Sequence, residues 1–65
     1  MSWGQNLVNA NMELNRAMFE MNRKGHPKND PCYKEKPDET YILKHMKDAL
    51  KDLQHAIKEL DNALF

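Results

Sequence analysis

The middle of the chain, from residue 23 to residue 36, carries the residues best suited to binding chemistry. Five lysines or arginines and two acidic residues give this segment a net charge of 5 − 2 = +3, although the whole chain is neutral. Guanidinium and ammonium groups bind phosphate and carboxylate oxygens, and an aromatic ring packs against cations. The candidate ligand-binding residues are Arg23, Lys24, His26, Lys28, Tyr33, Lys34 and Lys36.

This basic segment fits two kinds of ligand, a phosphate-bearing small molecule such as a nucleotide or an acidic protein surface. The same composition is typical of a solvated connector whose lysines keep it soluble, and the sequence leaves both interpretations open. Ten basic residues balance ten acidic ones over the chain, which argues against a protein whose whole surface binds polyanions.

Three side chains are possible metal ligands: His26, Cys32 and His45. Structural zinc sites usually contain paired ligands at short spacing, and these residues form no CxxC or HxxxH pair. A reactive cysteine thiolate needs an activating neighbour, which the sequence does not identify for Cys32. We therefore expect no metal and no cofactor.

A charged group near the end of the chain has helical spacing. Asp48, Asp52, His55 and Glu59 follow one another at intervals of four, three and four residues, which places them on one face of a helix. Carboxylate and histidine side chains with this spacing bind metals when they point into a helical bundle. Here they lie opposite the apolar residues, so the sequence predicts a solvated charged face.

The chain contains few residues of the types that commonly act in catalysis. Ser2 is the only serine, Thr40 is the only threonine, and Gly4 and Gly25 are the only glycines, so the chain lacks a phosphate-cradling glycine-rich loop. It also lacks a short recognition helix that carries basic residues. We expect neither an enzyme nor a protein that binds nucleic acid in a sequence-specific way.

Apolar spacing predicts a long helix over residues 38–64. Leucine or isoleucine recurs every seven residues, and further apolar residues fill the alternate positions, as in a helix with one apolar face. Ala49, Ala56 and Ala63 border this face, so another helix can approach closely. Its predicted contribution to an oligomer seam is Leu43, Met46, Leu50, Leu53, Ile57, Leu60 and Leu64.

A first helix is predicted over residues 2–24. Ser2 and Gln5 have the spacing of a capping box. Leu7, Leu14 and Met21 repeat every seven residues and complete the predicted oligomer seam. Ion pairs at helical spacing are expected on the outside of this helix, and five asparagines either bond across an interface or face solvent. The ion-pair residues are Glu13, Arg16, Glu20 and Lys24, and the asparagines are Asn6, Asn9, Asn11, Asn15 and Asn22.

Residues 25–37 contain three prolines and no apolar periodicity. Gly25 is expected to end the first helix in a left-handed cap. Helices in bundles are usually joined by about 2–8 residues, so this loop is longer than folding requires. The sequence predicts one all-α domain over residues 1–65, an antiparallel helical hairpin in which Ala10 and Ala17 face the alanines of the second helix.

A hairpin of 65 residues buries only about 60% of the surface of its unfolded chain. With one cysteine and no paired metal ligands, it has no cross-link to stabilise it. We therefore expect copies of the chain to assemble into a dimeric four-helix bundle or a higher homo-oligomer.

A single cysteine favours a reducing compartment. The first residues lack the basic and apolar regions of a secretory signal, and no apolar run is long enough for a membrane span. The expected location is cytoplasmic, without a membrane partner.

Binding is the expected function, because the chain lacks catalytic residues. The leading hypothesis is an oligomeric inhibitor or adaptor that docks on a host or cellular protein, a style common among very small viral and mobile-element proteins. One alternative is an oligomer that sequesters an anionic small molecule such as a nucleotide through the basic loop. A second alternative is a structural assembly protein.

Overall fold

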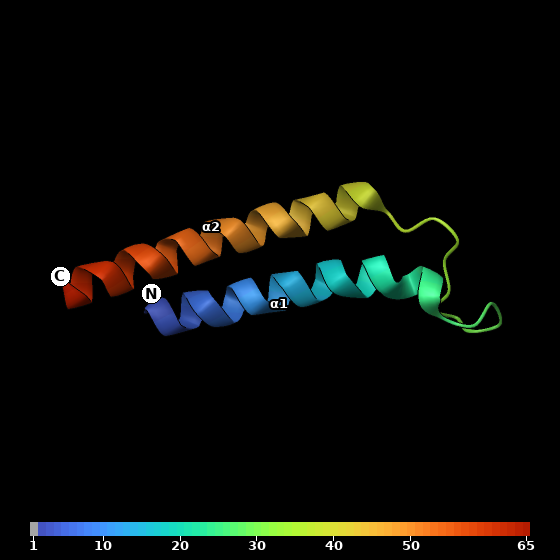
Figure 1. Ribbon diagram of the computed structural model, residues 1–65, viewed down its shortest axis with the longest axis horizontal. Helices are drawn as coiled ribbons and strands as arrows, with labels where there is room; N and C mark the ends of the chain where they lie inside the picture. Colours follow the sequence, from blue (N-terminus) through green and yellow to red (C-terminus); the bar gives the residue numbers. More distant parts are fainter. Residues whose placement is uncertain (1) are drawn as a thin grey trace.

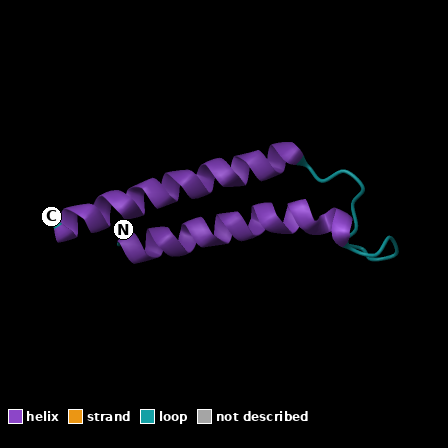
Figure 2. Cartoon of the chain, in the orientation of Figure 1, coloured by secondary structure: helices purple, strands orange, loops and turns teal. Residues whose placement is uncertain are grey.

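Two long helices run antiparallel and are joined at one end by an irregular connector (Figure 1). A computed structural model describes residues 2–65, so Met1, the first residue of the predicted domain, lies outside it. Helix α1 covers Trp3–Met21, a short 3-10 helix η1 covers Asn22–Gly25, and helix α2 covers Glu39–Leu64. The described residues contain only helix and loop (Figure 2). The prediction of an all-α helical hairpin is confirmed.

Both helices begin at a side-chain cap. The Ser2 hydroxyl accepts a hydrogen bond from the Gln5 backbone N–H at 3.3 Å, as the capping-box spacing predicts. Within the described residues the Gln5 side chain forms no return bond to Ser2, and its Nε2 donates to Asn9 Oδ1 at 3.1 Å. The Asp38 carboxylate accepts from the Tyr41 backbone N–H at 3.1 Å. These caps satisfy N–H groups that have no partner within the first turn of a helix.

The end of α1 differs from the prediction. No described glycine has a positive φ, so the expected left-handed cap at Gly25 is wrong. The α-helix ends at Met21, and the chain tightens into η1. The closer i→i+3 bonds of a 3-10 turn satisfy carbonyl groups at a helix end, which removes the need for a left-handed residue.

The connector between η1 and α2 is irregular but internally bonded. The Asp30 backbone N–H donates to the Pro27 carbonyl, and the Tyr33 backbone N–H donates to the Asp30 carbonyl, both at 2.9 Å. The Asp30 side chain also accepts from the Cys32 backbone N–H at 2.8 Å. Arg23 Nε donates to the Cys32 carbonyl at 2.9 Å. These bonds form consecutive turns and attach them to η1.

Alanine forms the apolar part of the contact between the helices. Ala10 and Ala17 of α1 and Ala49 and Ala56 of α2 are each 3–5% exposed, and they confirm the predicted close approach of the two helices. Ala63, predicted to join them, is exposed. Ala63 is next to the last residue of α2, and the C-terminal end of this helix extends past the N-terminal end of α1 (Figure 1).

The hairpin is elongated and has a thin core. Its Cα radius of gyration is 15.2 Å and its extents are 52 × 17 × 15 Å, whereas a compact domain of this length has a radius near ~11 Å. Among the described residues, the buried hydrophobic side chains are the four alanines alone. Most of the apolar surface of both helices therefore lies outside the contact between them.

Candidate functional site

The leucines, isoleucine and methionines predicted to form an oligomer seam line one side of the hairpin. Residues from both helices meet there, because one apolar groove is lined by Leu14, Met18 and Met21 of α1 and by Ile42 and Met46 of α2. These side chains remain largely accessible, and Leu50 is 55% exposed. We define the apolar face as Leu7, Leu14, Met18, Met21, Leu43, Met46, Leu50, Leu53, Ile57, Leu60 and Leu64.

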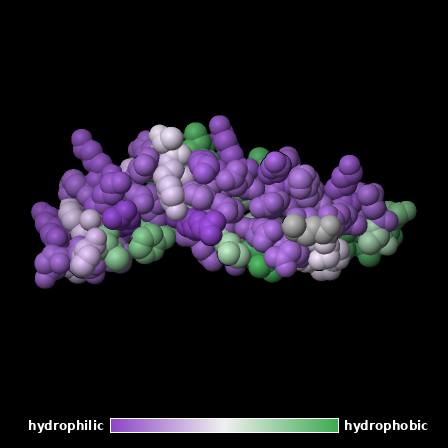
Figure 3. Space-filling view, turned by 180° about the vertical axis from the view of Figure 1, so that it is seen from behind, coloured by the Kyte–Doolittle hydropathy of each residue, from purple (hydrophilic) through white to green (hydrophobic). Residues whose placement is uncertain are grey.

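The side of the hairpin seen from behind has a different character. It is mostly hydrophilic, with hydrophobic side chains in separate groups along its edges (Figure 3). Within residues 2–65, neither helix has the length and apolar character needed to cross a membrane.

A second apolar group lies on α1. Val8, Met12 and Phe19 are 52%, 48% and 54% exposed. Their positions along the helix place them on the side opposite Ala10 and Ala17, and therefore away from α2. We call these three residues the outer patch.

Polar side chains alternate with the alanines between the helices and form what we call the polar seam. On α1 its members repeat every seven residues, and each is partly or wholly buried. Every one of them bonds to α2 or to its N-terminal cap. The pairs are Asn6 with Glu59, Glu13 with His45, and Glu20 with the backbone of Asp38.

The polar seam overturns two sequence predictions. Glu13 and Glu20 do not lie on the outside of α1, because Glu13 is half-buried and Glu20 is only 6% exposed. The predicted charged face of α2 also packs partly against α1. Of its four residues, Asp48, Asp52 and Glu59 are half-buried, and His55 is exposed.

The asparagines divide between the two possibilities left open by the sequence. The buried Asn6 amide donates to Glu59 Oε1 across the helix interface at 2.9 Å. Asn11, Asn15 and Asn22 are exposed. Asn6 therefore supports the hairpin directly across the interface.

Glu20 joins α1, the connector and α2. Its Oε1 accepts from Arg23 Nη1 at 3.2 Å, and its Oε2 accepts from the Asp38 backbone N–H at 2.9 Å. Lys34 Nζ lies 3.6 Å from the same Oε2. The hydrogen bond from Asp38 is the largest cause that holds the pKa of the Glu20 carboxyl below its ordinary value. Glu20 thus favours its charged form and fixes the start of α2 against α1.

Glu13 and His45 meet in the middle of the hairpin. A carboxylate only accepts hydrogen bonds, so His45 Nδ1 carries the proton and donates to Glu13 Oε2. Arg16 Nη1 lies 2.6 Å from the other oxygen, Glu13 Oε1. The bond from His45 is the main cause that lowers the pKa of Glu13. The Tyr41 ring packs against the imidazole with its centroid 4.2 Å away.

The stability of the hairpin is expected to fall in acid through these two carboxylates. Both have a folded-state pKa below the ordinary value of 4.5. Their contribution is therefore complete above that value and is lost as the pH falls through the lower folded-state pKa. Thermal unfolding measured by circular dichroism from about pH 6 to about pH 3 should show a falling Tm below about pH 4.5.

The Glu20→Gln variant provides the test of this assignment. It should be less stable than the native chain at neutral pH and should lose less stability on acidification, because one responsive carboxylate is missing. Asp61→Asn is the matched control, since Asp61 is exposed and forms no ion pair with another residue in the described range. An identical acid response in Glu20→Gln and the native chain would contradict the role of Glu20.

Three of the seven candidate ligand-binding residues contact acidic side chains of the same chain. Arg23 and Lys34 both lie against Glu20, which neutralises part of their charge. The Tyr33 hydroxyl donates to Glu35, and this bond raises the pKa of Tyr33. These three side chains therefore help to order the connector.

The other four candidates are more available. His26 Nδ1 lies 3.8 Å from Asp30 Oδ2. Lys24, Lys28 and Lys36 form no hydrogen bond or ion pair with any residue from 2 to 65 and are exposed. The basic character predicted for this end of the hairpin is concentrated in these lysines.

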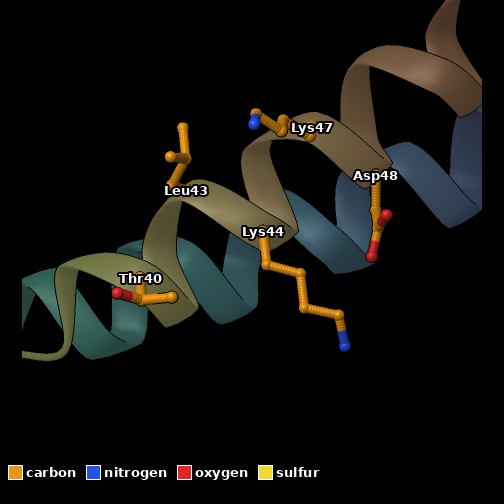
Figure 4. A pocket seen from close by; sticks show the side chains of 5 residues that line it. All are labelled: Thr40, Leu43, Lys44, Lys47 and Asp48. Carbon is orange, nitrogen blue, oxygen red and sulfur yellow. The ribbon is translucent and has the colours of Figure 1, made fainter.

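A shallow depression lies along the first half of α2. Its lining residues all come from that one helix, and their side chains point in different directions rather than toward a common point (Figure 4). A ligand pocket usually has a few convergent polar groups, so this depression lacks the form of one. The lining residues are Thr40, Leu43, Lys44, Lys47 and Asp48.

Comparison with known proteins gave no match: no protein-family model fits the chain, and no curated protein or solved structure is significantly similar to it.

Proposed function

We propose that this chain is a small, non-enzymatic binding protein that pairs through its apolar face and docks on a protein partner through its outer patch. The observation that carries the proposal is the distribution of apolar residues. Sixteen large apolar or aromatic side chains are exposed, whereas the buried hydrophobic residues are four alanines, counted over residues 2–65. Large exposed apolar surfaces are typical of interaction sites.

The surface area supports a second copy of the chain as the occupant of the apolar face. The hairpin exposes 5156 Å², whereas a compact monomer of 7.7 kDa exposes about 4,300 Å². The excess of roughly 800 Å² equals the area that each partner buries in an interface of standard size. Pairing two hairpins would give a four-helix bundle with leucine-rich layers at its centre.

The outer patch supports docking on another protein. Val8, Met12 and Phe19 lie on the side of α1 away from α2, and they stay exposed when the apolar face is covered. Methionine and aromatic side chains are enriched in protein interfaces, and methionine adapts to irregular partner surfaces. In this arrangement the dimer is the scaffold, and the outer patch binds the target as an inhibitor or adaptor would.

Phe19→Asp tests the docking surface. We expect it to abolish recovery of the partner when the purified, tagged chain is incubated with extract of its native cells and bound proteins are quantified by mass spectrometry. Asn11→Asp, an equally small change in charge at an exposed position of α1, should retain the partner. Both variants should keep the helicity and the oligomer size of the native chain. Equal recovery by Phe19→Asp would contradict docking through the outer patch.

Sequestration of an anionic small molecule is the second candidate. It is favoured by three lysines, Lys24 of η1 and Lys28 and Lys36 of the connector, which have no acidic partner in the described chain. Native mass spectrometry of gently purified protein would separate the candidates. An added mass of a few hundred daltons per site, lost when these lysines are changed to alanine, would favour sequestration. An oligomer with neither added mass nor a protein partner would favour the third candidate, a structural role.

A further inference from the structure

We propose that Glu13, His45 and Asp48 form a binding site for a divalent transition-metal ion that links α1 to α2. Each residue offers one ligand atom, and the three atoms lie within 4.8 Å of one another. Two ligands come from α2 and one comes from α1. His45 and Asp48 are three residues apart, which places them on neighbouring turns of one helix face.

The donor set suits a borderline cation such as Zn²⁺. Zinc is bound by histidine nitrogen and carboxylate oxygen at about 2.0–2.2 Å, and three protein ligands leave a fourth position for water. Two carboxylates balance the double positive charge of the ion. An imidazole in the set disfavours Mg²⁺ and Ca²⁺, which prefer oxygen ligands.

The surroundings hold two of the ligands in place. His45 is 9% exposed, and its ring packs on Tyr41 while its Nδ1 faces Glu13. Arg16 contacts the other oxygen of Glu13, which leaves Oε2 directed at the imidazole. Such outer contacts orient the ligands of metal sites. The ion would replace the proton that His45 Nδ1 shares with Glu13 Oε2.

Asp48 completes the site from the adjacent turn. It is half-buried, and it forms no hydrogen bond or ion pair with another residue in the described part of the chain. Its carboxylate is thus available for coordination without the loss of an existing bond. Figure 4 shows that Lys47, its chain neighbour, points away from it, whereas Lys44 extends on the same side.

The test is a titration of the full chain with Zn²⁺ at neutral pH in the presence of a reducing agent, with binding measured by isothermal titration calorimetry. We expect one ion per chain and a rise in Tm with added Zn²⁺, since a ligand that binds only the folded state stabilises it. Asp48→Asn should weaken binding by about tenfold or more and leave the metal-free Tm nearly unchanged. His45→Gln should also weaken binding, because its amide donates to Glu13 but is a poor zinc ligand.

His55→Gln is the matched control, since His55 is exposed on the same helix, and it should bind Zn²⁺ like the native chain. Co²⁺ provides a second readout, because its visible absorption reports a coordinated ion directly. Absence of binding by the native chain would overturn the proposal. So would unchanged affinity in Asp48→Asn, or a loss of binding in Cys32→Ser that Asp48→Asn does not show.

Discussion

Leu50→Asp is expected to dissociate the proposed oligomer and to lower its stability by about 3–5 kcal/mol per chain, the usual penalty for an unpaired buried charge. In a lone hairpin the same change would cost less than about 1 kcal/mol, because Leu50 is already 55% exposed. The size of the decrease in stability therefore shows whether the apolar face is covered by a second chain or exposed to solvent. Sedimentation equilibrium gives the mass of the assembly, and urea unfolding gives the free energy of unfolding.

Asn62→Asp is the control for this variant. It adds the same charge to an exposed position of α2, on the side of the helix away from Leu50, so it should keep the native oligomer size. If the chain pairs as proposed, its unfolding should also depend on protein concentration, because folding and association would be coupled. A native chain that sediments as a monomer would contradict pairing through the apolar face.

Ala49→Leu is expected to destabilise the hairpin by about 2–3 kcal/mol, because added methylene groups in a well-packed contact force side chains and backbone apart. Ala49 is 3% exposed and lies in the contact between the two helices. The measurement is urea unfolding followed by circular dichroism at a fixed protein concentration.

Ala63→Leu makes the same substitution on the same helix at an exposed position. It should change the free energy of unfolding by no more than about 0.5 kcal/mol. If both variants were equally stable, the alanines would not set the distance between the helices, and the contact between α1 and α2 would need a different description.

Much of the fold was predictable because apolar spacing and capping residues act over short distances. Ser2 and Asp38 cap their helices through residues three positions away. The repeat of leucines every seven residues marks a helix whatever lies beside it. Ala10 and Ala17 also indicated the close contact, since small residues at one face permit it.

The polar seam was not predicted, because apolar residues alone marked the packed faces of the helices and charged residues were expected to face solvent. Glu13 is half-buried and Glu20 is buried because His45 and the N-terminus of α2 offer them partners from a distant part of the chain. The sequence nevertheless contains a pattern that indicates the polar seam. Asn6, Glu13 and Glu20 repeat every seven residues and lie three or four positions from the buried alanines, which is the spacing of a shared helix face.

The connector was also hard to predict. Five basic residues in a short segment indicated an anion site, but Arg23 and Lys34 are held by Glu20. Their pairing depends on how the chain folds back, which local composition does not determine. A ligand-binding role for this segment now depends on Lys24, Lys28 and Lys36, which have no bonded partner in the described chain.

The alternation of alanines with polar pairs also determines how far one helix can slide along the other. If α2 slipped by one heptad, alanine would again face alanine, so the apolar contacts alone would tolerate the error. Glu13 would then lie opposite Asp52 in place of His45, and two carboxylates would meet in a half-buried setting. Like charges at such a position disfavour the slipped alignment. The polar seam thus determines the register of the two helices, a role well attested for buried polar groups in coiled coils. The long connector therefore does not need to set their alignment.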